Sequence, residues 1–168
     1  WGRPQDEVST LMNILVEYFT AQIDELHEKN VRVRVLGDLS ALPQLQRDTV
    51  QNAIDRTAGN TGLTFNIALN YGGRAELVCA ARRLIEQGLE PEQIDEAAFE
   101  AQLYTVGLPD VDLLIRTSGE MRTSNFLPWQ TAYSGIIFNP ILWPDYTREE
   151  YRKDLVRYAA RDRRFGKV

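Results

Sequence analysis

Short runs of branched apolar residues alternate with longer segments of helical spacing along this chain. Apolar side chains recur every three or four residues over 7–29, which predicts a long amphipathic first helix. The further predicted elements are, in order, a strand over 31–36, a helix over 45–57, a strand over 64–69, a helix over 74–87, an acidic helical stretch from Pro91, strands over 111–115 and 136–138, and a last helix capped by Thr147. This alternation indicates an α/β fold with a mostly parallel open sheet and helices on both faces.

The composition is that of a globular chain, with 43% hydrophobic and 26% charged residues. We see no repeat, low-complexity tract or linker, and therefore predict a single domain over residues 1–168. The net charge of −5 and the lack of a basic stripe argue against a nucleic-acid partner. No apolar stretch is long enough to span a bilayer, and Cys79 has no second cysteine to pair with. We expect a cytoplasmic protein.

A polar segment follows directly after the predicted strand over 111–115. Residues 116–126 contain two arginines, a glycine and four hydroxyl side chains. Ligands gather outside the carboxyl ends of strands in open α/β sheets, and the planar guanidinium matches a phosphate group bidentately. The segment predicts a pocket for a diphosphate-like anion. The alternative is a surface turn with two solvated arginines and a Ser/Thr helix cap.

A second glycine-containing turn, over 70–74, joins a predicted strand to a predicted helix. Backbone amides at such a junction can face a phosphate group. The Lys-Ser/Thr ending of a P-loop is missing, and the two glycines are equally explained by a tight turn.

Six further motifs stand beside the string Arg-Thr-Ser-Gly-Glu…Arg-Thr-Ser-Asn-Phe of residues 116–126. They occupy residues 1–4 with 7–8, 11–12, 57–63, 70–74, 142–145 and 163–166, and so extend over nearly the whole chain. With these motifs in this order, the chain resembles the cis-prenyltransferase family of the undecaprenyl diphosphate synthase type.

The resemblance implies a prenyltransferase that condenses isopentenyl diphosphate with an allylic diphosphate, with farnesyl diphosphate as the expected primer. The expected product is a Z-polyprenyl diphosphate, the precursor of a lipid carrier such as undecaprenyl diphosphate. The resemblance also implies Mg²⁺ as cofactor, a homodimer, and a peripheral membrane contact for product release.

Carried over position by position, the resemblance assigns substrate-binding roles to several residues. Arg116, Arg122 and Ser124 would hold the diphosphate of isopentenyl diphosphate, and Thr123 would add a further contact. The allylic diphosphate would meet Arg3, with Trp1 beside it, while Arg164 and Gly166 match a C-terminal motif that reaches the partner subunit's site in family dimers.

The resemblance also implies an apolar product tunnel along the first helix and two strands. The positions that would line it are Leu11, Ile14, Val31 and Leu63. These residues are equally explained as hydrophobic core. If they line a tunnel, side-chain size near Leu63 would influence product length.

Two departures from the family pattern qualify this expectation. Gly135 stands where the family usually places a glutamate associated with Mg²⁺, and glycine has no oxygen ligand to offer. The family's leading strands, phosphate loop and catalytic Asp would lie upstream of Trp1, so we expect an N-terminally incomplete chain. Two other functions stay open: a non-catalytic partner subunit of a heteromeric prenyltransferase, and an unrelated α/β phosphate-binding protein.

Overall fold

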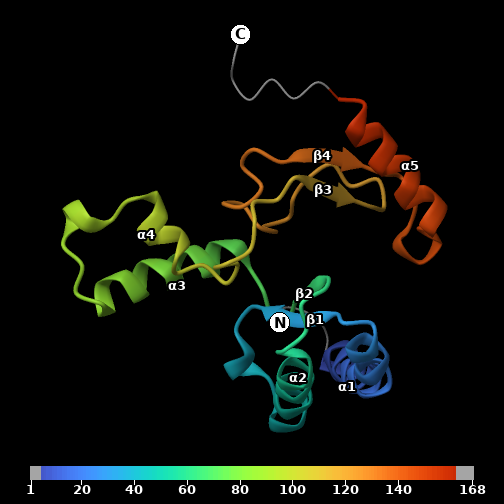
Figure 1. The fold of residues 1–168 in the computed structure, drawn as a ribbon, viewed down its shortest axis with the longest axis horizontal. Helices are drawn as coiled ribbons and strands as arrows, with labels where there is room; N and C mark the ends of the chain where they lie inside the picture. Colours follow the sequence, from blue (N-terminus) through green and yellow to red (C-terminus); the bar gives the residue numbers. More distant parts are fainter. Residues whose placement is uncertain (1–4, 162–168) are drawn as a thin grey trace. The chain divides into compact units, whose positions relative to one another are not determined.

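The computed structural model describes residues 5–161, which form helices and parallel strands (Figure 1). The chain divides into two compact units, the first ending at Tyr71 and the second beginning at Gly72. In each unit, one pair of parallel strands is packed against helices. The α/β class and the parallel pairing are thus confirmed, whereas the single domain stays a prediction.

The first unit begins with a long helix. Its elements are α1 (Gln5–Glu28), β1 (Arg32–Leu36), the short 3-10 helix η1 (Leu39–Ala41), α2 (Gln44–Thr57) and β2 (Thr64–Ala68). α1 confirms the predicted long first helix, and it packs beside α2 (Figure 1). Although α1 has 24 residues, neither it nor any other helix within 5–161 is long and apolar enough for a membrane crossing.

The core of the first unit is built on the register of its two strands. Val33 of β1 lies opposite Phe65 of β2, and Val35 lies opposite Ile67. The buried apolar side chains of this core come from β1, from α2 and from the segments beside them: Val31, Val33, Leu36, Leu42, Val50 and Ala53. The buried Thr57 hydroxyl accepts from the Val33 amide at 3.0 Å and donates to the Ala53 carbonyl at 2.8 Å. It therefore ties the end of α2 to β1.

The second unit carries the arginine-containing segment. Its elements are α3 (Gly73–Glu86), the 3-10 helix η2 (Pro91–Gln93), α4 (Glu96–Glu100), β3 (Leu113–Arg116), β4 (Gly135–Phe138), the 3-10 helix η3 (Trp143–Asp145) and α5 (Arg148–Ala159). β3 and β4 are parallel, with Leu113 opposite Gly135 and Arg116 opposite Phe138. The predicted strand over 111–115 therefore begins two residues later and includes Arg116. Ladder bonding, which local sequence does not encode, sets these limits.

Helix α5 begins at a side-chain cap, as predicted. The Thr147 hydroxyl accepts from the Glu150 amide at 3.3 Å, and Glu149 and Glu150 occupy the first turn. Acidic side chains at this end of a helix interact favourably with its dipole.

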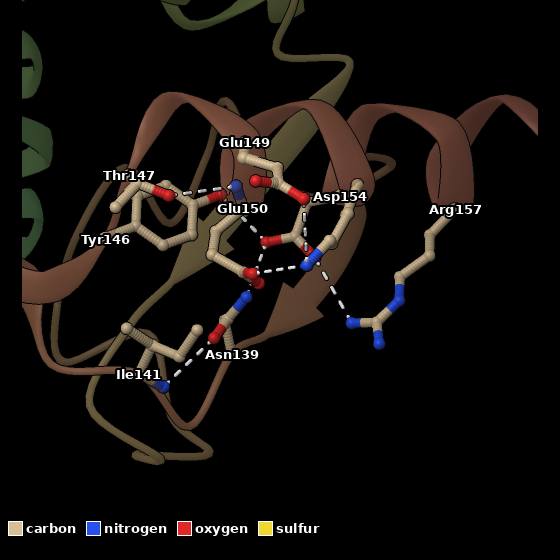
Figure 2. A network of polar contacts seen from close by, with 9 residues as sticks. Asn139, Ile141, Tyr146, Thr147, Glu149, Glu150, Asp154 and Arg157 are labelled. Atoms are coloured by element: carbon tan, nitrogen blue, oxygen red, sulfur yellow. Dashed lines mark hydrogen bonds and ion pairs between the residues drawn. The ribbon is translucent and has the colours of Figure 1, made fainter.

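A buried carboxylate, Asp154, fixes α5 to the segment that follows β4 (Figure 2). Asn139 Nδ2 and the Tyr146 hydroxyl each donate to Asp154 Oδ2 at 2.8 Å, and Arg157 Nη1 lies 3.3 Å from Oδ1. Asn139 in turn accepts from the Ile141 amide at 3.0 Å. Because a buried carboxylate is tolerated only when it is paired and hydrogen-bonded, these contacts hold helix and strand end together.

Burial raises the pKa of the Tyr146 phenol, and the hydrogen bond to Asp154 and its negative charge raise it further. The folded state therefore favours the protonated phenol. This contribution to stability is complete below the ordinary tyrosine pKa of about 10 and is lost as the pH rises above it.

We predict that Asp154→Ala lowers the free energy of unfolding by about 2 to 4 kcal/mol, because the Asn139 amide and the Tyr146 hydroxyl lose their shared acceptor in a buried site. Urea denaturation of the full chain measures the change. Asp145→Ala is the control, since this nearby carboxylate is exposed, and we expect it to stay within about 0.5 kcal/mol of the wild type. Equal stability of the two variants would contradict the anchoring role of Asp154.

Candidate functional site

The segments that leave the carboxyl ends of β3 and β4 run together beyond the sheet. The Asn139 amide donates to the Arg116 carbonyl at 2.7 Å, and the Ser118 amide donates to the Ile141 carbonyl at 2.8 Å. The Gly119 amide also donates to the Asn139 carbonyl, at 3.1 Å. The beginning of the arginine loop, defined here as residues 116–126, is thereby fixed to the segment that follows β4.

The two arginines of the loop differ in their surroundings. Arg116, the last residue of β3, is half-buried and forms no ion pair with any residue in 5–161. Arg122 has a side chain that is 66% exposed, and its Nη1 lies 2.5 Å from Glu120 Oε2. An exposed ion pair of this kind contributes about 1 kcal/mol or less, so a diphosphate with higher charge can displace Glu120.

The second half of the loop holds the predicted hydroxyl ligands. Ser124 is exposed, and Thr123 is half-buried with its carbonyl accepting from the Phe126 amide at 3.1 Å. Ser118, Ser124, Asn125 and Leu127 all have positive φ, between 47° and 71°. Residues with side chains other than asparagine and aspartate rarely adopt this left-handed conformation unless their surroundings enforce it. The loop shape is therefore held by tertiary contacts.

One such contact engages the glycine turn before α3. Asn125 accepts two amides there, that of Gly73 on its carbonyl at 2.9 Å and that of Arg74 on its side-chain Oδ1 at 2.8 Å. A Cβ at Gly73 would lie 2.1 Å from Pro128 Cδ, so glycine is required for close approach. The alternative of a tight glycine contact thus accounts for this turn, because Asn125 occupies the amides that could have faced a phosphate.

Sequence reasoning gave Asn125 no role, although the residue lies inside the quoted motif. Asparagine is favoured both at helix caps and in the left-handed conformation, which was the available signal. Its partner, 51 residues away, could not be read from the sequence.

An apolar cavity of about 360 Å³ lies between α1 and the β1–β2 sheet in the first unit. Its lining consists of Tyr18, Phe19, Gln22, Ile23, Leu26, Val33, Phe65 and Ile67. None of the four predicted tunnel residues lines it: Val31 is buried in the core, whereas Leu11, Ile14 and Leu63 are 46%, 44% and 69% exposed. This volume is within the range of small-molecule sites.

The position of the expected metal ligand is filled by a neighbouring ring. A Cβ at Gly135 would lie 2.8 Å from Cε2 of Tyr158, so a larger side chain requires that ring to move. Asp112 is adjacent, with its carbonyl accepting from the Gly135 amide at 2.9 Å. Within residues 5–161, no group of three His, Cys, Asp or Glu side chains is arranged to hold a metal ion.

Four predicted site residues, Trp1, Arg3, Arg164 and Gly166, lie outside the described residues. Their roles towards the allylic diphosphate and towards a partner subunit stay predictions.

We predict that Gly73→Ala destabilises the chain by about 3 kcal/mol, because the methyl group would overlap Pro128 and approach the Asn125 carbonyl to 2.9 Å. Chemical denaturation measures this loss. Gly59→Ala is the matched control, since nothing lies within 4 Å of its added Cβ. A Gly73→Ala variant as stable as Gly59→Ala would refute the close packing of the turn against the arginine loop.

Two curated relatives span the whole of this chain. The isoprenyl transferase of Heliobacterium mobile is 50% identical over 172 residues, and that of Streptococcus agalactiae serotype III (strain NEM316) is 49% identical over 176 residues. The chain covers 66% of the length of the first and 70% of the second.

Two solved structures share the fold. Lavandulyl diphosphate synthase from Lavandula x intermedia, in complex with dimethylallyl diphosphate, gives a TM-score of 0.94 at 37% identity, over 99% of this chain and 74% of that one. A probable undecaprenyl diphosphate synthase from Campylobacter jejuni gives 0.89 at 35% identity, over 99% of this chain and 78% of that one. The family model "Putative undecaprenyl diphosphate synthase" matches residues 1–166. With this match and relatives at about half identity, the chain belongs to the undecaprenyl diphosphate synthase family of cis-prenyltransferases.

Proposed function

We propose that this chain acts in the condensation of isopentenyl diphosphate with an allylic diphosphate to give a Z-polyprenyl diphosphate. The observation that carries the proposal is the arginine loop, which has Arg116 at the carboxyl end of β3 and Arg122 and Ser124 in the segment that follows. Family membership supports the reaction class. Farnesyl diphosphate as primer and undecaprenyl diphosphate as product are the finer parts of the proposal, and they rest on the family resemblance.

In this proposal, the loop binds and orients the diphosphate of isopentenyl diphosphate. The Arg116 guanidinium, which has no ion-pair partner within residues 5–161, supplies a cation that needs no displacement. Arg122 exchanges the Glu120 carboxylate for a diphosphate oxygen, and Ser124 donates from its exposed hydroxyl. Holding the diphosphate fixes the isopentenyl alkene for attack on the allylic carbon. A carbon–carbon bond then forms, the diphosphate group leaves the allylic carbon with the carbon–oxygen electron pair, and the isopentenyl unit loses a proton that the released diphosphate can accept.

The growing chain requires an apolar channel, and the cavity between α1 and the β1–β2 sheet offers an apolar wall for part of it. The structural relative from Lavandula was solved with dimethylallyl diphosphate, which is itself an allylic diphosphate. That ligand supports an allylic diphosphate as the second substrate of this chain.

The described residues do not fit a Mg²⁺ site of their own. Gly135 provides no ligand, the ring of Tyr158 occupies the space beside it, and the part of the chain between residues 5 and 161 lacks a metal-binding group of three side chains. We therefore assign none of residues 5–161 to Mg²⁺. The binding experiment below, with and without Mg²⁺, tests the Mg²⁺ dependence that the resemblance implies.

Gly135 favours a second candidate function, a non-catalytic subunit of a heteromeric prenyltransferase. A carboxylate cannot be placed there while Tyr158 keeps its position, since even a Cβ would lie 2.8 Å from the ring. A subunit that leaves the metal chemistry to its partner has no need of that carboxylate. The intact arginines favour substrate binding, which places this alternative second.

We predict that the full chain binds isopentenyl diphosphate and that Arg122→Ala weakens binding at least about tenfold, because a charge-assisted hydrogen bond is lost. Calorimetric titration with and without Mg²⁺ measures this. Arg152→Ala, which removes an exposed arginine from α5, is the control for net charge and keeps wild-type affinity. A folded wild-type chain that fails to bind under both conditions would overturn the proposal. If the chain turns over substrate and substitutions at Gly135 leave its turnover rate unchanged, the non-catalytic alternative would be disfavoured.

We further predict that Ile67→Trp shortens the longest product, because the indole fills the cavity beside α1. The resemblance instead predicts that Leu63→Ala changes product length. Chromatography of the prenyl products made by the active enzyme compares the two variants with the wild type. Shorter products from Ile67→Trp with no change in Leu63→Ala would put the tunnel at the cavity; the reverse result would put it at Leu63.

A further inference from the structure

Asn125 connects the arginine loop to the first turn of α3, although the two segments are far apart in sequence. Its main-chain carbonyl accepts from the Gly73 amide at 2.9 Å, and its side-chain Oδ1 accepts from the Arg74 amide at 2.8 Å. Both oxygens of one residue thus bind consecutive amides at one helix end.

These two bonds satisfy donors that α3 cannot satisfy by itself. The first amides of a helix have no partner within it, and they are normally capped by the side chain of the preceding residue. Here the preceding residue is Gly72, which has no side chain to do so. Asn125 therefore caps α3 from outside.

The glycines of the turn fit this contact. A Cβ at Gly72 would lie 3.3 Å from Asn125 Nδ2, and a Cβ at Gly73 would lie 2.9 Å from the Asn125 carbonyl oxygen. The absence of side chains at both positions lets Asn125 reach the helix. Its φ of 64° is one that asparagine adopts more readily than most residues.

Asn125 also follows directly on the residues that would hold the substrate. Ser124 precedes it and Arg122 lies three positions before it, and both of these residues are exposed. The cap is thus the anchor next to the binding residues. Because α3 contributes the buried residues Ala80 and Leu84 to the core, the anchor point is rigid.

We propose that Asn125 is a positioning residue for isopentenyl diphosphate: by capping α3 it fixes the backbone that presents Arg122 and Ser124. This inference rests on the proposed function. The cap accounts for the two glycines of the turn, since a Cβ at either position would meet Asn125.

Two substitutions of Asn125 distinguish the loss of its side-chain cap from the loss of its other interactions. Asn125→Gly keeps the left-handed backbone and the main-chain acceptor, and it loses only the side-chain acceptor. Asn125→Ser restores a neutral side-chain oxygen of a residue type that caps helices well. Serine is also compatible with this backbone, since Ser118 and Ser124 have φ of 71° and 49° in the same loop.

Calorimetric titration of the full chain with isopentenyl diphosphate tests the proposal. We expect Asn125→Gly to raise the dissociation constant about tenfold, the equivalent of losing one cap, and Asn125→Ser to stay within about threefold of the wild type. In a turnover assay, the KM for isopentenyl diphosphate rises in Asn125→Gly while kcat at saturation stays within about twofold.

The control is Asp95→Ala. Asp95 caps α4 through a bond of the same length, 2.8 Å to the Ala98 amide, without touching the arginine loop. We expect it to lower the melting temperature as Asn125→Gly does and to leave the dissociation constant unchanged. If Asp95→Ala weakens binding as much as Asn125→Gly does, the weaker binding comes from lower overall stability, and the positioning role is overturned.

The remaining outcomes separate this inference from the proposed function. If the wild type binds, Arg122→Ala does not, and Asn125→Gly binds as the wild type does, the positioning role is overturned while the function stands. Equal weakening in Asn125→Gly and Asn125→Ser would attribute the effect to the Asn125 Nδ2 group and not to its accepting oxygen, and would also overturn the cap. If the wild type does not bind isopentenyl diphosphate, both the positioning role of Asn125 and the proposed function are overturned.

Discussion

The parallel pairing of β3 with β4 is the constraint on which the second unit depends. The ladder places Arg116 opposite Phe138 and continues beyond the strands, through the Arg116 carbonyl and the Ser118 amide. Parallel pairing brings the carboxyl ends of both strands to the same edge. The polar segment after β3 therefore emerges beside the segment after β4, and the arginines lie at the edge where α/β proteins bind their ligands.

Two polar anchors outside the ladder stabilise this edge. Asp154 fixes α5 to the segment after β4 by accepting from Asn139 and Tyr146 (Figure 2). Asn125 fixes the other side of the arginine loop to α3. Each anchor satisfies groups that would be costly to leave unpaired in a buried or helix-terminal position. Both therefore lock backbone geometry, whereas Arg122 and Ser124 stay exposed for a ligand.

The apolar part of the proposed site also combines residues that hold the fold with residues that line an open space. In the first unit, the α1 and sheet residues that meet around the cavity include Ile23, Val33 and Ile67. The core and the cavity are lined by the same kinds of apolar side chain. They differ only in how closely the side chains pack. Val31, just before β1, is buried in the core, and Val33 of β1 is buried as well but also lines the cavity.

The sequence by itself determined the α/β class, the long first helix, the Thr147 cap and the family, because periodicity, capping residues and motifs are local signals. It also located the arginine loop. Only the tertiary structure decided that Arg116 ends a strand, that Asn125 caps α3 from 51 residues away, and that the ring of Tyr158 fills the space beside Gly135. The physical reason is that ladder bonds, external caps and close packing join residues distant in the chain. The local sequence around one residue does not show which distant residue is its partner.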